Sequence, residues 1–208
     1  ADVVNRELAS VTDNPVVTGT PQAPEVHSQA HAVGAALGLA MDGLATAAAE
    51  LAAISVRRIA RLVNPLVSGL PAFLAESDGV CSGFMIIQYT AAALAAENRR
   101  LAAPASLDGG ITSALQEDIL THATAAADKT LSIIGNLETI LAIEIMSAAQ
   151  AYDMQPDKAG RAPGTDTLHQ RIRTTVPFYR DDRRLNNLVA AAREILQTTH
   201  AGIRADAG

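Results

Sequence analysis

Small apolar residues recur at helical spacing over three long stretches of the chain. Between residues 26 and 62 the sequence has no proline, and Ala, Leu, Met and Ile return every three or four positions. Arg57, Arg58 and Arg61 gather near the end of this stretch, where cations interact favourably with the helix dipole. The pattern predicts one helix of about 37 residues, which would be roughly 55 Å long at 1.5 Å per residue.

Two further stretches have the same pattern. One extends from about residue 84 to 102 and is followed by Pro104, which a helix does not tolerate in its interior. The other extends from about residue 115 to 151, with Ser113 as an alternative start. Each of these stretches predicts another long helix.

The segments between these stretches are rich in Pro, Gly, Thr and Asp, which favour turns and loops. A short strand at Val16 and Val17 is the β structure that we expect. Asp166 is the expected N-cap of the first of two short helices near the end of the chain. The loops are expected at 12–25, 64–83, 103–114 and 153–166, and the short helices at 167–174 and 182–203.

These elements predict an all-α fold, namely an elongated bundle of very long helices that forms a single domain over residues 1–208. Three helices of such length cannot bury all of their apolar sides within one chain of 208 residues. We therefore expect other chains to cover them, in an obligate oligomer whose interface consists of these helices.

Composition excludes several classes of function. Hydrophobic residues make up 49% of the chain and aromatic residues 3%, so a core of small side chains is expected, in which helices approach closely. A net charge of -6 leaves no basic face for nucleic acid. The apolar stretches are mostly Ala and Gly and are interrupted by Asp42, which argues against a membrane span. Cys81 is the single cysteine, which excludes an intrachain disulfide and fits a cytoplasmic protein.

A Gln-Glu-Asp triplet falls where the third long helix is expected to begin. It consists of Gln116, Glu117 and Asp118, and His122 follows four residues after the aspartate. Acidic side chains in a first turn commonly cap the helix and interact with its dipole, and Asp118 and His122 would form a surface pair. The residues alone favour this capping role over a catalytic one.

His27 and His31 have the i, i+4 spacing of a two-histidine metal face on a helix. No suitably spaced Glu or third ligand accompanies them. Polar histidines near a helix start are therefore the favoured interpretation, and no metal site is expected. The serines and Cys81 show no nucleophile-elbow or Cys-His signature either.

Five stretches occur together in a fixed order within about residues 1–196. They are SVTDNPVV (10–17), RRIARLVNPLVSGLPAFL (57–74), SGFMIIQYTAAALAAENRRLAAPAS (82–106), TSALQED (112–118) and VPFYRDDR (176–183). Together they resemble the C-terminal part of histidine ammonia-lyases and, more broadly, the aromatic amino acid lyase and aminomutase family. The resemblance implies a mostly helical subunit with a central bundle of very long helices, assembled into a homotetramer whose subunits share active sites.

The family eliminates ammonia from an α-amino acid, or shifts its amino group, with an electrophilic 4-methylidene-imidazol-5-one (MIO) made from an internal Ala-Ser-Gly. Such a group captures the amine and makes it a leaving group, so that a base can remove a poorly acidic β-proton. These 208 residues contain no Ala-Ser-Gly. The resemblance therefore implies that the MIO comes from another segment or from a companion N-terminal chain.

The resemblance also assigns residues to the site. Glu117 matches the position that faces the substrate near the prosthetic group, so it is the expected catalytic residue, and Gln116 lies beside it. A carboxylate there can hold a cationic side chain or the departing amine. His27 matches a histidine at the mouth of the pocket.

Four positions depart from the pattern of histidine lyases. Glu25 and Val26 stand where the family has Asn and Phe, and Leu115 and Ile119 stand where histidine lyases have Asn and His. An aromatic substrate ring would lose its stacking partner at Val26. We therefore expect a polar, cationic amino acid that uses Glu25 and Glu117 to fit at least as well as histidine.

Three hypotheses remain open at this point. The first is one half of a lyase or aminomutase, split between two polypeptides or cleaved, which the start of the chain inside an expected helix favours. The second is a lyase-fold enzyme without MIO that carries out addition or elimination on another substrate, which the changed pocket residues favour. The third is a non-catalytic, oligomer-forming subunit in which the triplet only caps a helix. We rank them in that order.

Overall fold

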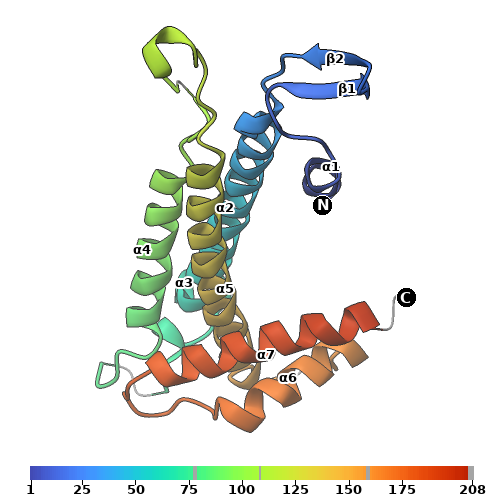
Figure 1. Cartoon of the computed structure of the whole chain (residues 1–208). Helices are drawn as coiled ribbons and strands as arrows, with labels where there is room; N and C mark the ends of the chain where they lie inside the picture. The colour runs from blue at the N-terminus through green and yellow to red at the C-terminus, as the bar shows by residue number, and fades with distance from the viewer. Residues whose placement is uncertain (77–78, 108, 158–159, 206–208) are drawn as a thin grey trace. The chain divides into compact units, whose positions relative to one another are not determined.

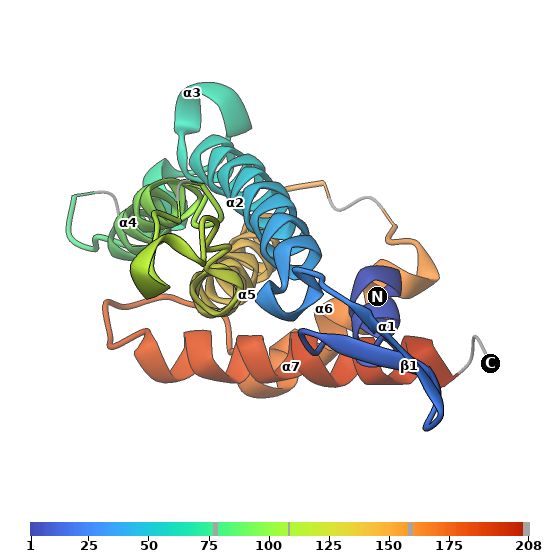
Figure 2. The ribbon, with the colours of Figure 1, turned by 45° about the horizontal axis from the view of Figure 1, so that its top comes forward.

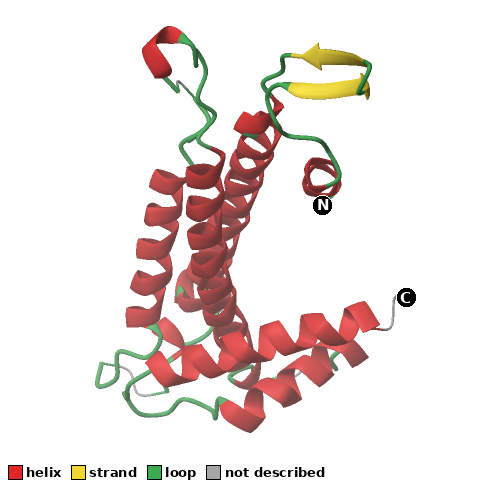
Figure 3. Cartoon of the chain, viewed as in Figure 1, coloured by secondary structure: helices red, strands yellow, loops and turns green. Residues whose placement is uncertain are grey.

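Helices dominate the chain. The computed structural model describes residues 1–76, 79–107, 109–157 and 160–205. Within this described part, Figures 1 and 3 show helices joined by loops and one antiparallel hairpin of two strands. The expected all-α class with very long helices is confirmed, since the two longest helices have 29 and 31 residues.

The order of the elements along the described part of the chain is as follows. The helices are α1 (Asp2–Leu8), α2 (Ala35–Val63), α3 (Pro65–Ser68), α4 (Met85–Leu101), α5 (Ala123–Asp153), α6 (Pro163–Thr175) and α7 (Asn186–Ala205). Short 3₁₀ turns lie at His31–Val33, Ala72–Leu74 and Ser113–Leu115, and the strands are β1 (Val16–Thr20) and β2 (Ala23–His27).

The chain forms two compact units. Unit 1 contains residues 1–48 and 100–134, and unit 2 contains residues 49–99 and 135–208. The helices α2 and α5 each contribute residues to both units. That all 208 residues make a single domain stays a prediction.

The helix expected from residue 26 begins at Ala35 instead. Residues 23–27 pair as β2 with the β-branched segment at the start of β1, in a register that places Val16 opposite His27. Gly34 then adopts a left-handed conformation, with a φ of 69°, and this separates the 3₁₀ turn from α2. The short strand expected at Val16 and Val17 is confirmed.

Other helix boundaries lie closer to expectation. The helix expected at 84–102 is α4, Met85–Leu101. The first short helix begins at Pro163, because proline suits the first helical position, so its N-cap is Ala162 and the expected capping by Asp166 is wrong. The last helix, expected over 182–203, is α7, Asn186–Ala205.

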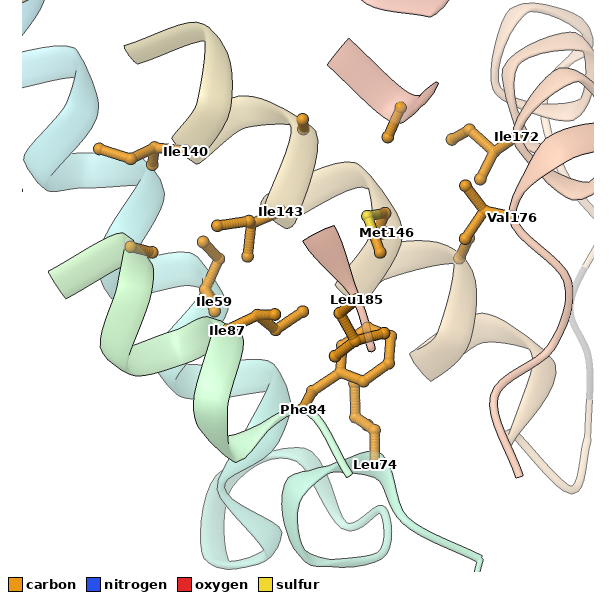
Figure 4. Close-up of a cluster of buried hydrophobic side chains, with 14 of the residues drawn as sticks. Ile59, Leu74, Phe84, Ile87, Ile140, Ile143, Met146, Ile172, Val176 and Leu185 are labelled. Atoms are coloured by element: carbon orange, nitrogen blue, oxygen red, sulfur yellow. The ribbon is translucent and has the colours of Figure 1, made fainter. Parts of the chain in front are cut away.

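The core of unit 2 gathers aliphatic side chains from five helices, namely α2, α4, α5, α6 and α7. Figure 4 shows Ile59 of α2, Ile87 of α4, Ile143 and Met146 of α5 and Ile172 of α6 converging there. Alanines on the same helices are buried beside them, namely Ala52, Ala91, Ala142 and Ala149. In unit 2 the helices α6 and α7 also lie side by side (Figure 2). The expected packing through small side chains is confirmed by these alanines.

Two helices pass a test of length and hydropathy for a membrane span. They extend over His31–Val63 and Ala123–Asp153, with a mean hydropathy of 1.5 in an 18-residue window. By length and mean hydropathy, the expectation that these stretches are not apolar enough to span a membrane is therefore wrong. The reason is that alanine counts as apolar, so alanine-rich bundle helices meet the same test.

A buried glutamine ties α5 to two loops of unit 2. Gln150 is fully buried, and its Nε2 donates to the carbonyl oxygen of Tyr179 at 2.8 Å and to that of Leu74 at 3.4 Å. Its Oε1 accepts from the backbone N–H of Tyr179 at 3.0 Å. Each of these buried backbone groups needs a partner, so one side chain satisfies both loops.

Replacing this glutamine tests that role. Gln150→Leu leaves buried backbone donors and acceptors without partners, so it should lower the free energy of unfolding by about 2–5 kcal/mol. The measurement is urea unfolding of the purified protein. Gln170→Leu is the matched control, because Gln170 is exposed, and it should change that free energy by less than about 0.5 kcal/mol. Equal effects of the two variants would contradict this role.

Candidate functional site

The hairpin of unit 1 carries three of the residues singled out in the sequence. Glu25, Val26 and His27 all lie exposed on β2. The ring of His27 is held by Thr18 of β1, with 3.0 Å between its Nε2 and the hydroxyl oxygen, and lies 3.6 Å from the carboxylate of Glu25. Alternation along the strand places these two side chains on one face of the hairpin and Val26 on the other.

The two histidines do not share a helical face. His27 lies on β2, whereas His31 lies in a 3₁₀ turn with its Nε2 3.3 Å from the carboxylate of Glu7 on α1. The expected i, i+4 arrangement is therefore wrong, because the helix begins only after both residues. In the described ranges no three His, Cys, Asp or Glu side chains come together as metal ligands.

The Gln-Glu-Asp triplet lies in a loop before α5. Thr112 and Glu117 form an isolated antiparallel bridge, in which the N–H of Thr112 donates to the carbonyl oxygen of Glu117 at 2.8 Å. Ser113, Ala114 and Leu115 all have positive φ values between 53° and 75°. The bridge and these left-handed residues exclude a continuous helix, so the helix start expected at 113 or 115 is wrong.

His122 has a φ of 46°, and α5 begins directly after it, at Ala123. Asp118 and His122 are therefore not i, i+4 neighbours on a helix, and the triplet does not cap α5. The side chains of residues 115–119 are all exposed. The hydroxyl of Thr112 donates to Oε2 of Glu117 at 3.2 Å, which orients the carboxylate.

The six candidate residues thus form two groups within unit 1. Glu25, Val26 and His27 belong to the hairpin, and Leu115, Gln116 and Glu117 belong to the loop. Figure 1 shows both segments at the end of unit 1 where α2 and α5 begin. A carboxylate, a carboxamide and an imidazole are therefore all presented at this end.

The structure adds features that the sequence did not single out. Thr112 holds the carboxylate of Glu117, although nothing in a lone threonine before the triplet signals this. Residues that follow the triplet in sequence, among them Thr121 and His122, line an open cavity of about 560 Å³ together with Val33. The loop therefore borders a space large enough for a small molecule.

Comparisons with known proteins identify the family. A model of the aromatic amino acid lyases matches residues 1–174. The chain belongs to the aromatic amino acid lyase family. The matched region includes both groups of candidate residues in unit 1.

Relatives in this family agree in sequence and structure. The histidine ammonia-lyase of Natranaerobius thermophilus is 45% identical over 196 residues, which cover 93% of this chain and 38% of that relative. The crystal structure of histidine ammonia-lyase from Trypanosoma cruzi matches with a TM-score of 0.87 at 36% identity, over 94% of this chain and 38% of that one. The phenylalanine aminomutase of Pantoea agglomerans matches with a TM-score of 0.85 at 30% identity, over 92% and 37%. The chain thus has an ammonia-lyase-like fold and spans less than two fifths of these proteins.

A glycine substitution at His122 distinguishes the observed loop from a helix. Glycine adopts a positive φ without strain, so His122→Gly should leave the free energy of unfolding unchanged or raise it by up to about 1 kcal/mol. The control is Ala47→Gly at an exposed position inside α2, which should lower it by about 1 kcal/mol. Chemical unfolding of both variants is the measurement. A loss at His122 equal to that at Ala47 would show that residue 122 is helical.

Proposed function

We propose that this chain is one part of an amino acid ammonia-lyase or aminomutase, in which another segment or a companion chain supplies the MIO. The similarity to histidine ammonia-lyases and to a phenylalanine aminomutase supports this proposal. The observation that carries it is the placement of Glu117. Its carboxylate is exposed in a tight loop and oriented by Thr112, rather than used to cap a helix.

Each residue then has a role set by its chemistry. Glu117 is the catalytic carboxylate, which binds an ammonium group or a cationic side chain of the substrate through a charge-assisted hydrogen bond. Gln116 offers an amide donor and acceptor beside it. Leu115 is the apolar neighbour of these two groups, and its side chain is 78% exposed.

The donor set fits an MIO brought from elsewhere. The carboxamide of Gln116 could donate to its carbonyl oxygen, and the carboxylate of Glu117 could accept from the ammonium group of the substrate; both side chains are exposed. When bound, the MIO supplies an electrophile for the amino group of the substrate. The residues of this chain bind and orient that amino group, and Glu117 stabilises its positive charge.

In this proposal the hairpin lies at the entrance to the substrate site. Glu25 and His27 lie on one face of the hairpin, 3.6 Å apart, and can contact a polar substrate. Val26 offers an aliphatic contact in place of an aromatic stacking partner. The proposed substrate is therefore a polar amino acid, with a cationic side chain favoured by Glu25 and Glu117.

We also propose a cytoplasmic oligomer rather than a membrane protein, with a tetramer-like helical core. Large apolar side chains are exposed along both long helices, namely Leu39, Leu44, Leu51, Ile54 and Leu131. Charged side chains lie on the same helices, and Asp42 pairs with Lys129 within unit 1. Further copies of the chain or its companion would cover the apolar residues.

An MIO-free enzyme is the second candidate. Val26 and Ile119 are 66% and 56% exposed and replace an aromatic and a polar group of histidine lyases, which favours a different substrate. In that case Glu117 acts as a general acid or base by itself. The two candidates differ in one property, because an MIO enzyme carries the ultraviolet absorbance of its prosthetic group and an MIO-free enzyme does not.

Substitution of the carboxylate tests the proposed function. Glu117→Gln keeps the shape of the side chain but removes its charge, so kcat for ammonia release or amino-group transfer should fall by at least about 10²-fold. The assay uses the assembled protein with a panel of polar, cationic and aromatic amino acids. Glu50→Gln is the matched control at an exposed position of α2, and its kcat should be unchanged.

Full activity of Glu117→Gln would contradict the proposal and would support a non-catalytic subunit. Loss of activity in a preparation without MIO absorbance would favour the MIO-free enzyme instead.

A further inference from the structure

A buried carboxylate holds the chain segment that leads toward the triplet. Asp42 of α2 is only 7% exposed. Its carboxylate accepts from the N–H of Ala105 at 3.1 Å and from the N–H of Ser106 at 2.8 Å, and lies 2.5 Å from the ammonium nitrogen of Lys129. Lys129 also donates to the carbonyl oxygen of Ala103 at 2.5 Å. The ion pair of Asp42 with Lys129, together with the hydrogen bonds of both side chains, therefore fixes residues 103–106 against α2 and α5.

The carboxylate of Asp42 is ionised in this position. Burial by itself works to raise its pKa, but the hydrogen bonds from Lys129, Ser106 and Ala105 lower the pKa well below its usual value. A buried charge of this kind is stable only when its partners stay in place. The segment 103–106 is thus a required partner of α2.

The segment that follows the triplet also packs on α2, close to residues 103–106. Thr121 is 7% exposed, and its hydroxyl donates to the carbonyl oxygen of Val33. A Cβ at Gly38, one turn before Asp42, would lie 2.9 Å from the carbonyl oxygen of Thr121 and 3.3 Å from the Cβ of Ser106. The absence of a side chain at Gly38 therefore lets both ends of the loop approach α2.

The two ends of the loop also lie against each other. A Cβ at Gly109 would come within 1.9 Å of the carbonyl oxygen of Leu120. The hydroxyl of Thr130 on α5 is shared between the carbonyl oxygens of Ala126 at 2.6 Å and of Met41 at 3.0 Å, so α5 lies against α2 beside Asp42. Residues 109–122, which we name the Glu117 loop, are therefore closed at their base.

We infer that Asp42 is a positioning residue for the Glu117 loop, because its ion pair with Lys129 and its bonds to residues 105 and 106 fix the base from which Glu117 is presented. The inference rests on the proposed function of Glu117. Asp42 acts through the backbone and does not touch the triplet. A displacement of about 1 Å at a reacting group costs on the order of 10²-fold in rate, so a fixed base has a direct effect on catalysis.

The test combines two measurements on the assembled protein. Asp42→Asn weakens the anchor, and the double variant Asp42→Asn with Lys129→Met removes both charges, so that no buried charge stays unpaired. Amide hydrogen exchange should become at least about tenfold faster in residues 109–119 of both variants, whereas the hairpin and unit 2 keep their protection. In the same samples kcat should fall by about 10²-fold with a smaller change in KM.

Two further variants serve as controls. Glu50→Gln removes an exposed carboxylate elsewhere on α2 and should change neither measurement. Asp42→Glu keeps the negative charge and should restore part of the protection and part of kcat.

Each outcome decides the inference. Unchanged exchange in the Glu117 loop, or faster exchange spread evenly over the hairpin and unit 2, overturns it and leaves Asp42 a general stability residue. Faster exchange confined to the loop with a normal kcat also overturns a positioning role. Confined faster exchange together with full activity of Glu117→Gln supports the anchor but rejects the proposed function, so the two failures are distinguishable.

Discussion

The pairing of Asp42 with Lys129 is the interaction on which the base of the Glu117 loop depends. A carboxylate among alanines has no water to stabilise it, and breaking a buried ion pair costs about 3–5 kcal/mol. The partners of Asp42 come from the segment 103–106 and from α5, so the carboxylate ties both to α2. In unit 2 a more exposed pair also joins these helices, since Glu144 of α5 accepts from Ser55 and Arg58 of α2.

Small side chains make these contacts possible. Alanines at positions 45 and 126 are completely buried in unit 1, and alanines at 52 and 142 are completely buried in unit 2. Helices packed through alanine approach closely enough for short charged and polar side chains to reach a neighbouring backbone. Some larger apolar side chains of the same helices stay exposed, such as Leu39 and Leu131, and they are the basis of the proposed oligomer.

The helical class and α4 were predictable because periodic apolar residues and a following proline mark them clearly. The starts of α2 and α5 were not predictable from the same pattern. Residues 23–25 were expected to end a loop, and Val26 and His27 to begin a helix, yet all of them pair with β1. The loop was expected at 103–114, but left-handed conformations at Ser113, Ala114 and His122 occur without glycine, so no residue type signalled that it continues to residue 122.

The candidate site was found through family resemblance rather than through spacing. The residues alone favoured a helix cap for Glu117, and the structure excludes that role because α5 begins after the triplet. In the sequence, Asp42 stood out only as an acidic residue that interrupts an alanine-rich stretch. A lone acid on the buried face of such a helix requires a partner, and that requirement is a signal that sequence reading can use.

The central claim is that this chain works with an MIO supplied from elsewhere. Native and denaturing mass spectrometry of the purified protein tests it most directly, because it identifies whatever accompanies the chain of 21.6 kDa. We predict a segment that contains Ala-Ser-Gly, either in the same polypeptide or in a companion chain. Its measured mass should be lower than the mass calculated from its sequence by two waters. A functional preparation that contains only this chain, or a partner without that triplet and that mass loss, would contradict it.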